Sequence, residues 1–319
     1  MTDEARGLRL GTRGSALAIR QTELVVESLR AAGFTSATEI VVVRTAGDES
    51  REPARRLGVG VFTSELEAAL RDHRIDLAVH SLKDLPATDS TGVVLGAVLP
   101  RADAADALVD REGRRLAQVP AGARVGTSSL RREALLRATR PDVQVVSVRG
   151  NVPRRLRLVD DGIVDAVVLA VAGLERLGQM GRMSERLPLD SWLPAPGQGA
   201  IAVQAREGDS RLLYVLRSID DPPTRWATTA ERAFLEALQA GCRAPVGACA
   251  LPMGQGRLAL RGSVATLDGM TSITDCLEST VADGHAAAGL GRALAERILR
   301  LGARTILANL RAEFDDLHE

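Results

Sequence analysis

The sequence predicts an α/β protein with more than one domain. Short apolar stretches of strand length alternate with stretches of helical period along most of the 319 residues. Glycine and proline separate many of these stretches, as is typical where strands and helices are joined by short loops. A chain of this length has room for two or three compact domains and a sizeable core.

The first segment begins with a strand, a helix and a second strand. These are expected at residues 8–11, about 15–32 and 38–44. A further helix is expected from Ser64 onward, and residues 75–80 form the next strand. Ligands of open α/β sheets bind beyond the carboxyl ends of the strands, so the residues that follow position 80 are candidates for a site.

A second α/β segment runs from about residue 105. Its expected elements are, in chain order, strand 124–126, a helix ending near 138, strand 143–148, helix 152–159, strand 166–170 and a further helix. The run at 193–199 is rich in proline and glycine and interrupts this alternation. Residues 200–203 are expected to return to the first sheet as a strand, so that two chain crossings form a hinge.

The last hundred residues are expected to form a small α+β domain. A linker is predicted at 221–223, which read Asp-Pro-Pro, and a capped helix start at 228–231, with Gly241 ending that helix. Strand-like runs at 246–251, 258–264 and 272–277 precede a helical C-terminus.

The composition excludes several kinds of partner. Lys plus Arg and Asp plus Glu each number 41, so no overall charge favours nucleic acid or an acidic membrane. The first seven residues contain no apolar signal core, and the longest apolar run, 166–174, is too short to span a bilayer. We therefore expect a cytoplasmic protein without nucleic-acid or membrane partners.

The three cysteines support neither disulfides nor a metal site. Cys242, Cys249 and Cys276 are odd in number and lack the spacing of paired ligands. Cys249 and Cys276 lie in apolar strands and are expected in the core. Cys242 follows Gly241 in a loop beside Arg243, where its thiol would be exposed and the cation would favour the thiolate. No histidine with a recognisable context follows it, so a cysteine hydrolase is not predicted.

Lysine occurs once in the chain, at Lys83. Of the 41 basic residues the other 40 are arginine, which indicates a position that requires a compact, flexible point charge. The alternative is a solvated surface lysine. Asp84 follows directly and would be suited to stabilising positive charge, although a helix N-terminal aspartate is the commoner explanation of such an acid.

Two strand ends carry similar arrangements of hydroxyl groups and arginines. Residues 126–132 read GTSSLRR and residues 149–155 read RGNVPRR, each between an expected strand and helix. Free backbone N–H groups and the helix dipole favour anions there, so both are candidate carboxylate or phosphate cradles. The alternative for each is a helix cap with solvated arginines. Arg13, after the first strand, is a third such cation, and we expect a polyanionic ligand between two domains. No Walker loop or GxGxxG run follows a strand, which favours carboxylates over nucleotides.

Six motifs in order resemble those of the hydroxymethylbilane synthase, or porphobilinogen deaminase, family. They read HSLKDLP at 80–86, GTSSLRR at 126–132, RGNV at 149–152, LAVAGLERL at 169–177, LPAPGQGA at 193–200 and AGCRAPVG at 240–247. The resemblance spans nearly the whole chain, and six motifs at matching spacing are highly specific.

The resemblance implies two α/β domains like those of periplasmic binding proteins, joined by a double hinge, and a small α+β C-terminal domain. The boundaries would be 1–100 with 198–219 for domain 1, 101–197 for domain 2 and 222–319 for domain 3. Family enzymes condense four porphobilinogen molecules with loss of ammonia on a covalent dipyrromethane cofactor, and water then releases hydroxymethylbilane. The expected partner is porphobilinogen alone, and the protein is expected to be monomeric.

The resemblance also assigns residues to roles. Asp84 would be catalytic, assisting the departure of ammonia and stabilising the cation that remains. The cofactor would be bound covalently by Cys242 and held by Ser81, Lys83, Thr127, Ser129, Arg131 and Arg132. The substrate and growing chain would contact Arg13, Ser15, Phe62, Arg149, Arg155, Arg176 and Gln198. No metal is expected.

One segment departs from the family pattern. A cation that the family often has before Phe62 is absent, because Val59 stands there. The loop at 46–60 is expected to be a mobile cover in which Arg55 and Arg56 supply the charge. The alternative function is a two-domain anion-binding or receptor module without catalysis, which would require neither Cys242 nor Asp84.

Overall fold

The computed structural model describes residues 7–44, 63–88, 90–240 and 244–315. The chain divides into two compact units, Met1–Ala102 with Gly199–Arg225, and Asp103–Gln198 with Trp226–Glu319. It therefore leaves the first unit after Ala102, returns at Gly199 and leaves again after Arg225. The division into three domains stays a prediction, because the second unit contains both residues 103–198 and the C-terminal part.

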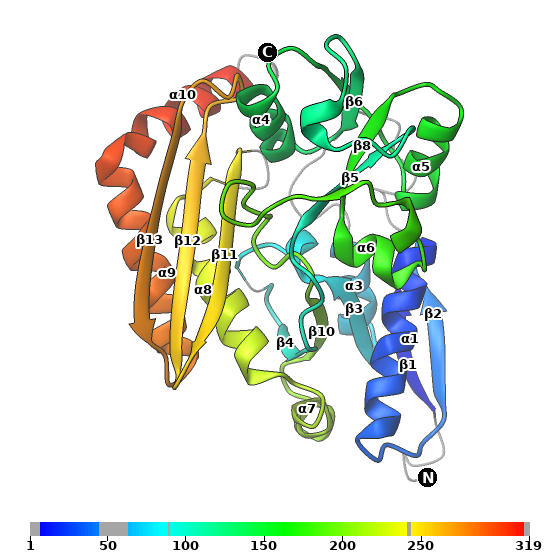
Figure 1. Cartoon of the computed structure of the whole chain (residues 1–319). Helices are drawn as coiled ribbons and strands as arrows, with labels where there is room; N and C mark the ends of the chain where they lie inside the picture. Colours follow the sequence, from blue (N-terminus) through cyan, green and yellow to red (C-terminus); the bar gives the residue numbers. More distant parts are fainter. Residues whose placement is uncertain (1–6, 45–62, 89, 241–243, 316–319) are drawn as a thin grey trace. The chain divides into compact units, whose positions relative to one another are not determined.

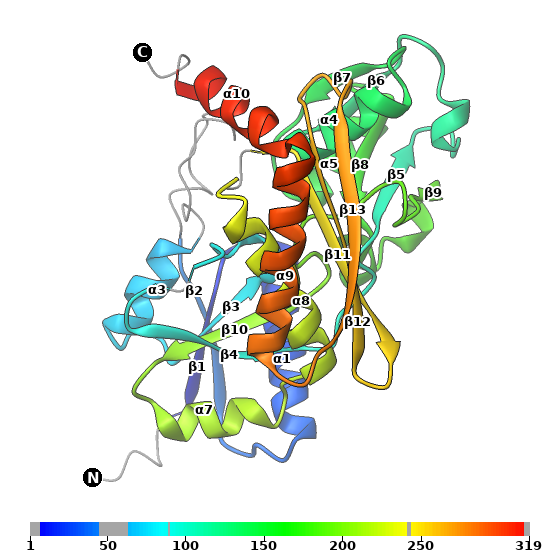
Figure 2. The same ribbon diagram turned by 90° about the vertical axis from the view of Figure 1, so that its left-hand side faces the viewer.

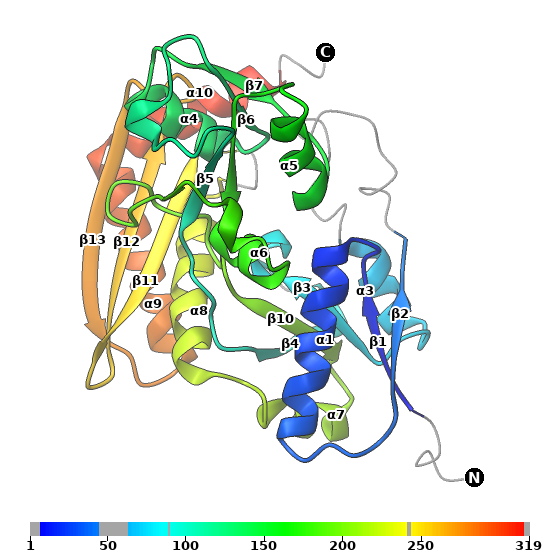
Figure 3. The same ribbon diagram turned by 45° about the vertical axis from the view of Figure 1, so that its right-hand side comes forward.

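The first unit is built on a five-stranded sheet in the order β2-β1-β3-β10-β4 (Figure 3). β1 (Leu8–Thr12) runs parallel to both β2 (Thr38–Val42) and β3 (Leu77–Ser81). β10 (Ile201–Arg206) lies antiparallel between β3 and β4 (Val93–Val98). The predicted return of the chain to the first sheet is thereby confirmed.

Helices cover both faces of this sheet. α1 (Ala16–Ala31) and α7 (Ser210–Arg217) bury one apolar face, which includes Leu10 and Val203. α3 (Ser64–Arg71) packs with Ala78 and neighbouring residues on the other face. Gly11 permits this close packing, because a Cβ there would lie 2.3 Å from Ile75 Cδ1.

The second unit contains a sheet of similar design, in the order β7-β6-β8-β5-β9. Three strands are parallel: β6 (Arg124–Thr127) lies between β7 (Gln144–Ser147) and β8 (Ala166–Ala170). β5 (Asp106–Asp110) runs antiparallel between β8 and β9 (Glu185–Arg186). The associated helices are α4 (Leu130–Thr139), α5 (Val152–Asp160) and α6 (Val171–Arg176).

A third, antiparallel sheet completes the second unit (Figure 1). Its strands are β11 (Val246–Gly254), β12 (Arg257–Ala265) and β13 (Ser272–Thr280). Helices α8 (Pro222–Ala237), α9 (Gly284–Ile298) and α10 (Arg304–Asp315) accompany it, and α8 and α9 lie together beside the sheet (Figure 2). Phe234 is fully buried in their shared core. The prediction of an α/β chain with a small C-terminal α+β part is confirmed.

The predicted linker at 221–223 is wrong. α8 begins at Pro222, and the backbone N–H of Thr224 donates to Asp221 Oδ2 over 3.0 Å, so Asp221 caps the helix. Proline is tolerated in a first helical turn because the N–H it lacks would have no helical partner. The predicted helix start at 228–231 is therefore also wrong, because Glu231 lies well inside α8. Gly241, the predicted end of this helix, lies outside the described residues.

Three strands escaped prediction, namely β4, β5 and the two-residue β9, and one cysteine was misplaced. β4 and β5 pair antiparallel with strands more than fifty residues away in sequence, and an apolar run of five or six residues does not reveal such a partner. Cys249 is buried in β11 as predicted, whereas Cys276 is exposed on β13. Alternate residues of β13 face outward, and Cys276 belongs to that set.

Among the described residues no helix is both long enough and apolar enough to cross a membrane. The predicted loop at 46–60, including Arg55, Arg56 and Val59, lies outside the described residues, as do Phe62 and Cys242.

Candidate active site

In the first unit, the end of β3 presents Lys83 and Asp84 on a tight turn. Leu82, Lys83 and Asp84 form a single 3-10 turn directly after Ser81. Leu82 and Leu85 are buried on either side, while Lys83 is half-buried and Asp84 is exposed. The two flanking leucines thus hold the turn against the core and leave the ammonium and carboxylate groups at the strand end, where the sequence predicts them.

Two hydroxyl groups of the first unit have partners within the protein. Ser81 Oγ lies 2.9 Å from Gln21 Nε2, which donates to it from α1. Ser15 caps α1, and its Oγ accepts from the backbone N–H of Ala18 over 3.2 Å. Ser81 Oγ also lies 3.1 Å from Gln21 Oε1, to which it can donate, so its O–H group already has a partner in the protein, whereas the contact of Ser15 with Ala18 uses its oxygen only as an acceptor. Contacts of Ser81, Ser15 and the half-buried Arg13 with a ligand stay predictions.

His80 is the buried residue next to this turn. Its side chain is almost fully enclosed. The pKa of His80 is lowered from 6.5 to about 4, mainly by burial and also by the charge of Arg13, against the opposing effect of a hydrogen bond with Gln204. The imidazole is therefore neutral near physiological pH.

In the second unit, the first predicted cradle is a capped helix start. Ser129 is the N-cap of α4 and accepts from the backbone N–H of Arg132 over 3.4 Å. Thr127, at the end of β6, accepts from the backbone N–H of Ser129 over 3.1 Å. Both hydroxyl oxygens thus satisfy backbone donors, which leaves their O–H groups as donors for an anion.

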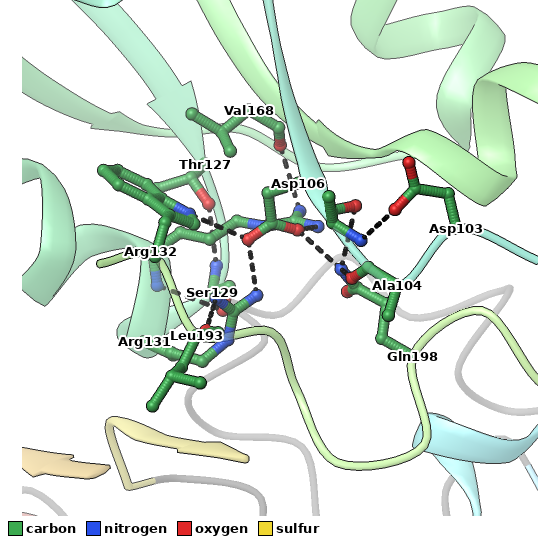
Figure 4. Close-up of polar contacts among 12 residues, drawn as sticks. Asp103, Ala104, Asp106, Thr127, Ser129, Arg131, Arg132, Val168, Leu193 and Gln198 are labelled. Atoms are coloured by element: carbon green, nitrogen blue, oxygen red, sulfur yellow. Dashed lines mark hydrogen bonds and ion pairs between the residues drawn. The ribbon is translucent and has the colours of Figure 1, made fainter. Parts of the chain in front are cut away.

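The two arginines of this cradle are buried, contrary to the alternative of solvated arginines. They meet at Asp106, the first residue of β5, which is fully buried (Figure 4). Arg131 Nη2 lies 2.8 Å from one carboxylate oxygen of Asp106, and Arg132 Nη2 lies 2.7 Å from the other. Arg131 also donates to the carbonyl of Leu193 over 2.6 Å.

Two neutral donors complete the surroundings of Asp106 (Figure 4). Trp192 Nε1 donates over 2.9 Å and Gln198 Nε2 over 2.8 Å. The Gln198 amide also donates to the carbonyl of Ala104 over 2.7 Å. The sequence did not predict these hydrogen bonds of Gln198 within the protein. Its contact with substrate stays a prediction. We call Asp106, Arg131, Arg132, Trp192 and Gln198 the Asp106 cluster.

The Asp106 cluster carries one more positive than negative charge. Burial alone would raise the pKa of Asp106, but the two guanidinium groups hold it well below its usual range, so the carboxylate is charged. Burial lowers the pKa of Arg131. The Nε atoms of both arginines are buried and have no hydrogen-bond partner among the described residues. Such a cluster favours a further anion.

The second predicted cradle is joined to the first by Arg155. Asn151 caps α5 and accepts from the backbone N–H of Arg154 over 3.1 Å. Arg155 Nε donates to the carbonyl of Gly150 over 2.8 Å, and its Nη2 donates to Ser128 Oγ over 2.9 Å. Arg155 therefore links the two strand ends. Arg149 is half-buried at the end of β7.

Arg176 ends α6 in a half-buried position. Burial lowers the pKa of Arg176 to about 10, against the opposing effect of Glu175, so the side chain remains charged at neutral pH.

Sequence reasoning missed Asp106 and Trp192. An acid that opens an apolar strand is a weak signal, and the arginines that it binds are 25 and 26 positions away in sequence. Only the pairing of β5 with β8 brings them together.

Comparisons with known proteins agree with the motifs. The family model described as "Porphobilinogen deaminase, dipyromethane cofactor binding domain" matches residues 8–214, and "Porphobilinogen deaminase, C-terminal domain" matches residues 226–300. The porphobilinogen deaminase of Desulforudis audaxviator is 49% identical over 309 residues, which are 96% of this chain and 99% of that protein. Those of Nocardia farcinica and Mycobacterium leprae are 48% and 46% identical, over 96% of this chain and 89% and 98% of theirs.

Asp106→Asn should strongly destabilise the second unit. The amide leaves two buried guanidinium groups without a counter-charge, for which a cost of about 3–5 kcal/mol is expected. Asp103→Asn is the control, since Asp103 pairs with Arg186 near the surface and should cost about 1 kcal/mol or less. Urea unfolding followed by circular dichroism measures both. Equal midpoints for the two variants would contradict a structural role for the Asp106 charge.

Stability should fall on acidification because His80 is buried and neutral. Its pKa in the folded protein, about 4, is below the 6.5 of the unfolded chain, so the unfolded state binds the proton first as the pH falls. The free energy of unfolding should therefore decrease between pH 6.5 and 4, by roughly 2 kcal/mol from pH 7 to pH 5. His80→Gln should remove this slope, and substitution of the exposed His285 by Gln should not. The same slope in His80→Gln as in the parent would refute the assignment.

Proposed function

This chain belongs to the porphobilinogen deaminase family, and on that premise we propose which of its residues carry out the family's reaction. The protein is a hydroxymethylbilane synthase, a transferase of tetrapyrrole biosynthesis. Four porphobilinogen molecules are joined head to tail with loss of one ammonia each, and water then releases hydroxymethylbilane. The observation that carries this conclusion is the family match across both segments, residues 8–214 and 226–300.

The donor groups of the second unit suit a ligand that bears carboxylates. Each pyrrole ring of the cofactor and of the growing chain carries an acetate and a propionate group. The Asp106 cluster has surplus positive charge and two buried Nε donors without partners among the described residues. Arginine forks match carboxylates with paired hydrogen bonds, so the chemistry of the site fits the dipyrromethane cofactor.

We propose the following division of these contacts. The dipyrromethane is joined through a thioether to Cys242, and its carboxylates are held by Ser81, Lys83, Thr127, Ser129, Arg131 and Arg132. Porphobilinogen and the growing chain are held by Arg13, Ser15, Phe62, Arg149, Arg155, Arg176 and Gln198. When bound, the cofactor supplies the free pyrrole carbon to which the first substrate is joined.

Asp84 is proposed as the catalytic residue. As an exposed carboxylate at the end of β3, Asp84 can accept hydrogen bonds from pyrrole N–H groups, and in its protonated form it can donate a proton to the departing amine. It can also stabilise the positive charge that develops on the ring as ammonia leaves. Lys83, its neighbour on the same turn, provides a flexible ammonium group for the carboxylates of the ligand.

A binding module without catalysis is the less favoured alternative. It would use the anion-binding arginines but would need neither the thiol of Cys242 nor the carboxylate of Asp84. The relatives that match over nearly their whole length are named as enzymes. We further propose that the enzyme is cytoplasmic and monomeric and has no nucleic-acid or membrane partner, in keeping with its balanced charge.

Purified protein should carry a covalent adduct with the mass of two linked pyrroles on Cys242. Cys249 is buried and should be unmodified, and the exposed Cys276 is the internal control for accessible thiols. Intact-mass measurement followed by peptide mapping locates the adduct. Active protein with an unmodified Cys242, or full activity of Cys242→Ala, would overturn the proposed attachment.

Asp84→Asn should retain the adduct but lose turnover by about a hundredfold or more, since an amide can neither exchange the proton nor balance positive charge. Asp72→Asn, at an exposed acid after α3, is the control and should turn over like the parent. Steady-state kinetics with porphobilinogen provides the measurement. Near-parental turnover of Asp84→Asn would mean that another group carries the chemistry.

A further inference from the structure

The turn between β12 and β13 lies directly against helix α4. The carbonyl of Leu267 accepts from Arg137 Nη1 over 2.8 Å. Gly269 has a φ of +74°, and a Cβ there would lie 2.5 Å from the carbonyl oxygen of Ala134 and 2.6 Å from the amide nitrogen of Ala138. The backbone of the turn thus contacts the backbone of the helix, which only glycine permits. We call residues 266–271 the docking turn.

The docking turn is held in shape by its own hydrogen bonds. The backbone N–H of Gly269 donates to the carbonyl of Thr266 over 3.1 Å, and that of Met270 donates to Asp268 Oδ1 over 3.0 Å. On the helix, Arg137 is oriented by an ion pair with Glu133 at 2.7 Å. Both partners are therefore structured by contacts other than the one between them, which favours a single docked geometry.

A second contact joins the third sheet to the same region. The backbone N–H of Ala248, in β11, donates to the carbonyl of Pro194 over 2.9 Å. The neighbouring carbonyl, of Leu193, accepts from Arg131 over 2.6 Å. A Cβ at Gly247 would lie 2.8 Å from Leu193 Cβ, so the two segments are in close contact. The third sheet therefore contacts the elements that hold Arg131 at two separate places.

We propose that the docking turn sets the position of the third sheet relative to the Asp106 cluster. The first strand of this sheet follows Cys242, the proposed attachment residue of the cofactor, in the sequence. Arg131 and Arg132 lie in the first turn of α4, and Gly269 contacts the backbone of its later turns at Ala134 and Ala138. β11 begins four residues after Cys242 in the sequence, so the proposed attachment point is within four residues of the third sheet along the chain. Small errors in the position of a tethered reactant can cost large factors in rate. The inference rests on the proposed attachment at Cys242.

The test compares Gly269→Ala with Gly254→Ala. Both glycines have positive φ and lie at turns of the third sheet, but a Cβ at Gly254 would meet nothing within 4 Å. The two variants share the backbone strain, and only Gly269→Ala must push the turn away from α4. We expect kcat of Gly269→Ala to fall about tenfold or more, with a smaller change in KM and altered proportions of enzyme-bound intermediates. Gly254→Ala should behave like the parent.

A milder pair of variants keeps the test decisive if Gly269→Ala does not fold. Arg137→Met removes the hydrogen bond to Leu267, and Arg137→Lys can restore one donor. Arg137→Met should lower kcat in the same direction, and Arg137→Lys should recover part of it. Equal kinetics and equal intermediates for both members of each pair would overturn the docking role. The adduct mass is measured for every variant: its retention keeps the attachment at Cys242 intact, whereas its absence from active protein overturns the attachment itself.

Discussion

The buried carboxylate of Asp106 is the group on which the second unit depends. It accepts hydrogen bonds from Arg131, Arg132, Trp192 and Gln198, which belong to α4 and to the segment that leads back to the first unit. One side chain thus joins β5, the start of α4 and the chain crossing. A buried ion pair is costly to desolvate, but removing one partner is costlier, because it leaves charge without compensation. The carboxylate of Asp106 and the guanidinium groups of Arg131 and Arg132 therefore depend on one another for their stability in the core.

On the proposed assignment, the Asp106 cluster would connect the stability of the second unit with ligand binding. The protein has no net charge overall, yet two guanidinium groups meet one carboxylate inside the second unit. Arg155 extends this positive region to the next strand end through its bonds to Gly150 and Ser128. A carboxylate-rich ligand would neutralise the surplus, so a structural role for Arg131 and Arg132 and a binding role are compatible. The positive charges of Arg131 and Arg132 would then be balanced partly by Asp106 and partly by the carboxylates of the ligand.

The groups proposed for chemistry and for holding the ligand are distributed over two compact units. Asp84 and Lys83 belong to the first, at the end of β3. The Asp106 cluster and the third sheet belong to the second unit. There α4 contacts Asp106 through Arg131 and the third sheet through Ala134, which lies against Gly269. β11 therefore contacts the segment whose Leu193 carbonyl accepts from Arg131, and it belongs to a different compact unit from the proposed catalytic acid.

Local patterns in the sequence determined the class of fold, most strand and helix positions, the return of β10 to the first sheet, and the strand ends that carry Asp84 and Arg131. These follow from apolar periodicity, from capping residues such as Ser129 and Asn151, and from motifs that need no knowledge of distant partners. The tertiary structure decided what periodicity cannot express. It paired Asp106 with arginines 25 and 26 residues away, turned Cys276 outward on β13, and brought Gly269 onto α4. Each of these depends on which strands pair and in which register, and that choice is made by the packing of the whole unit and not by the residues of one segment.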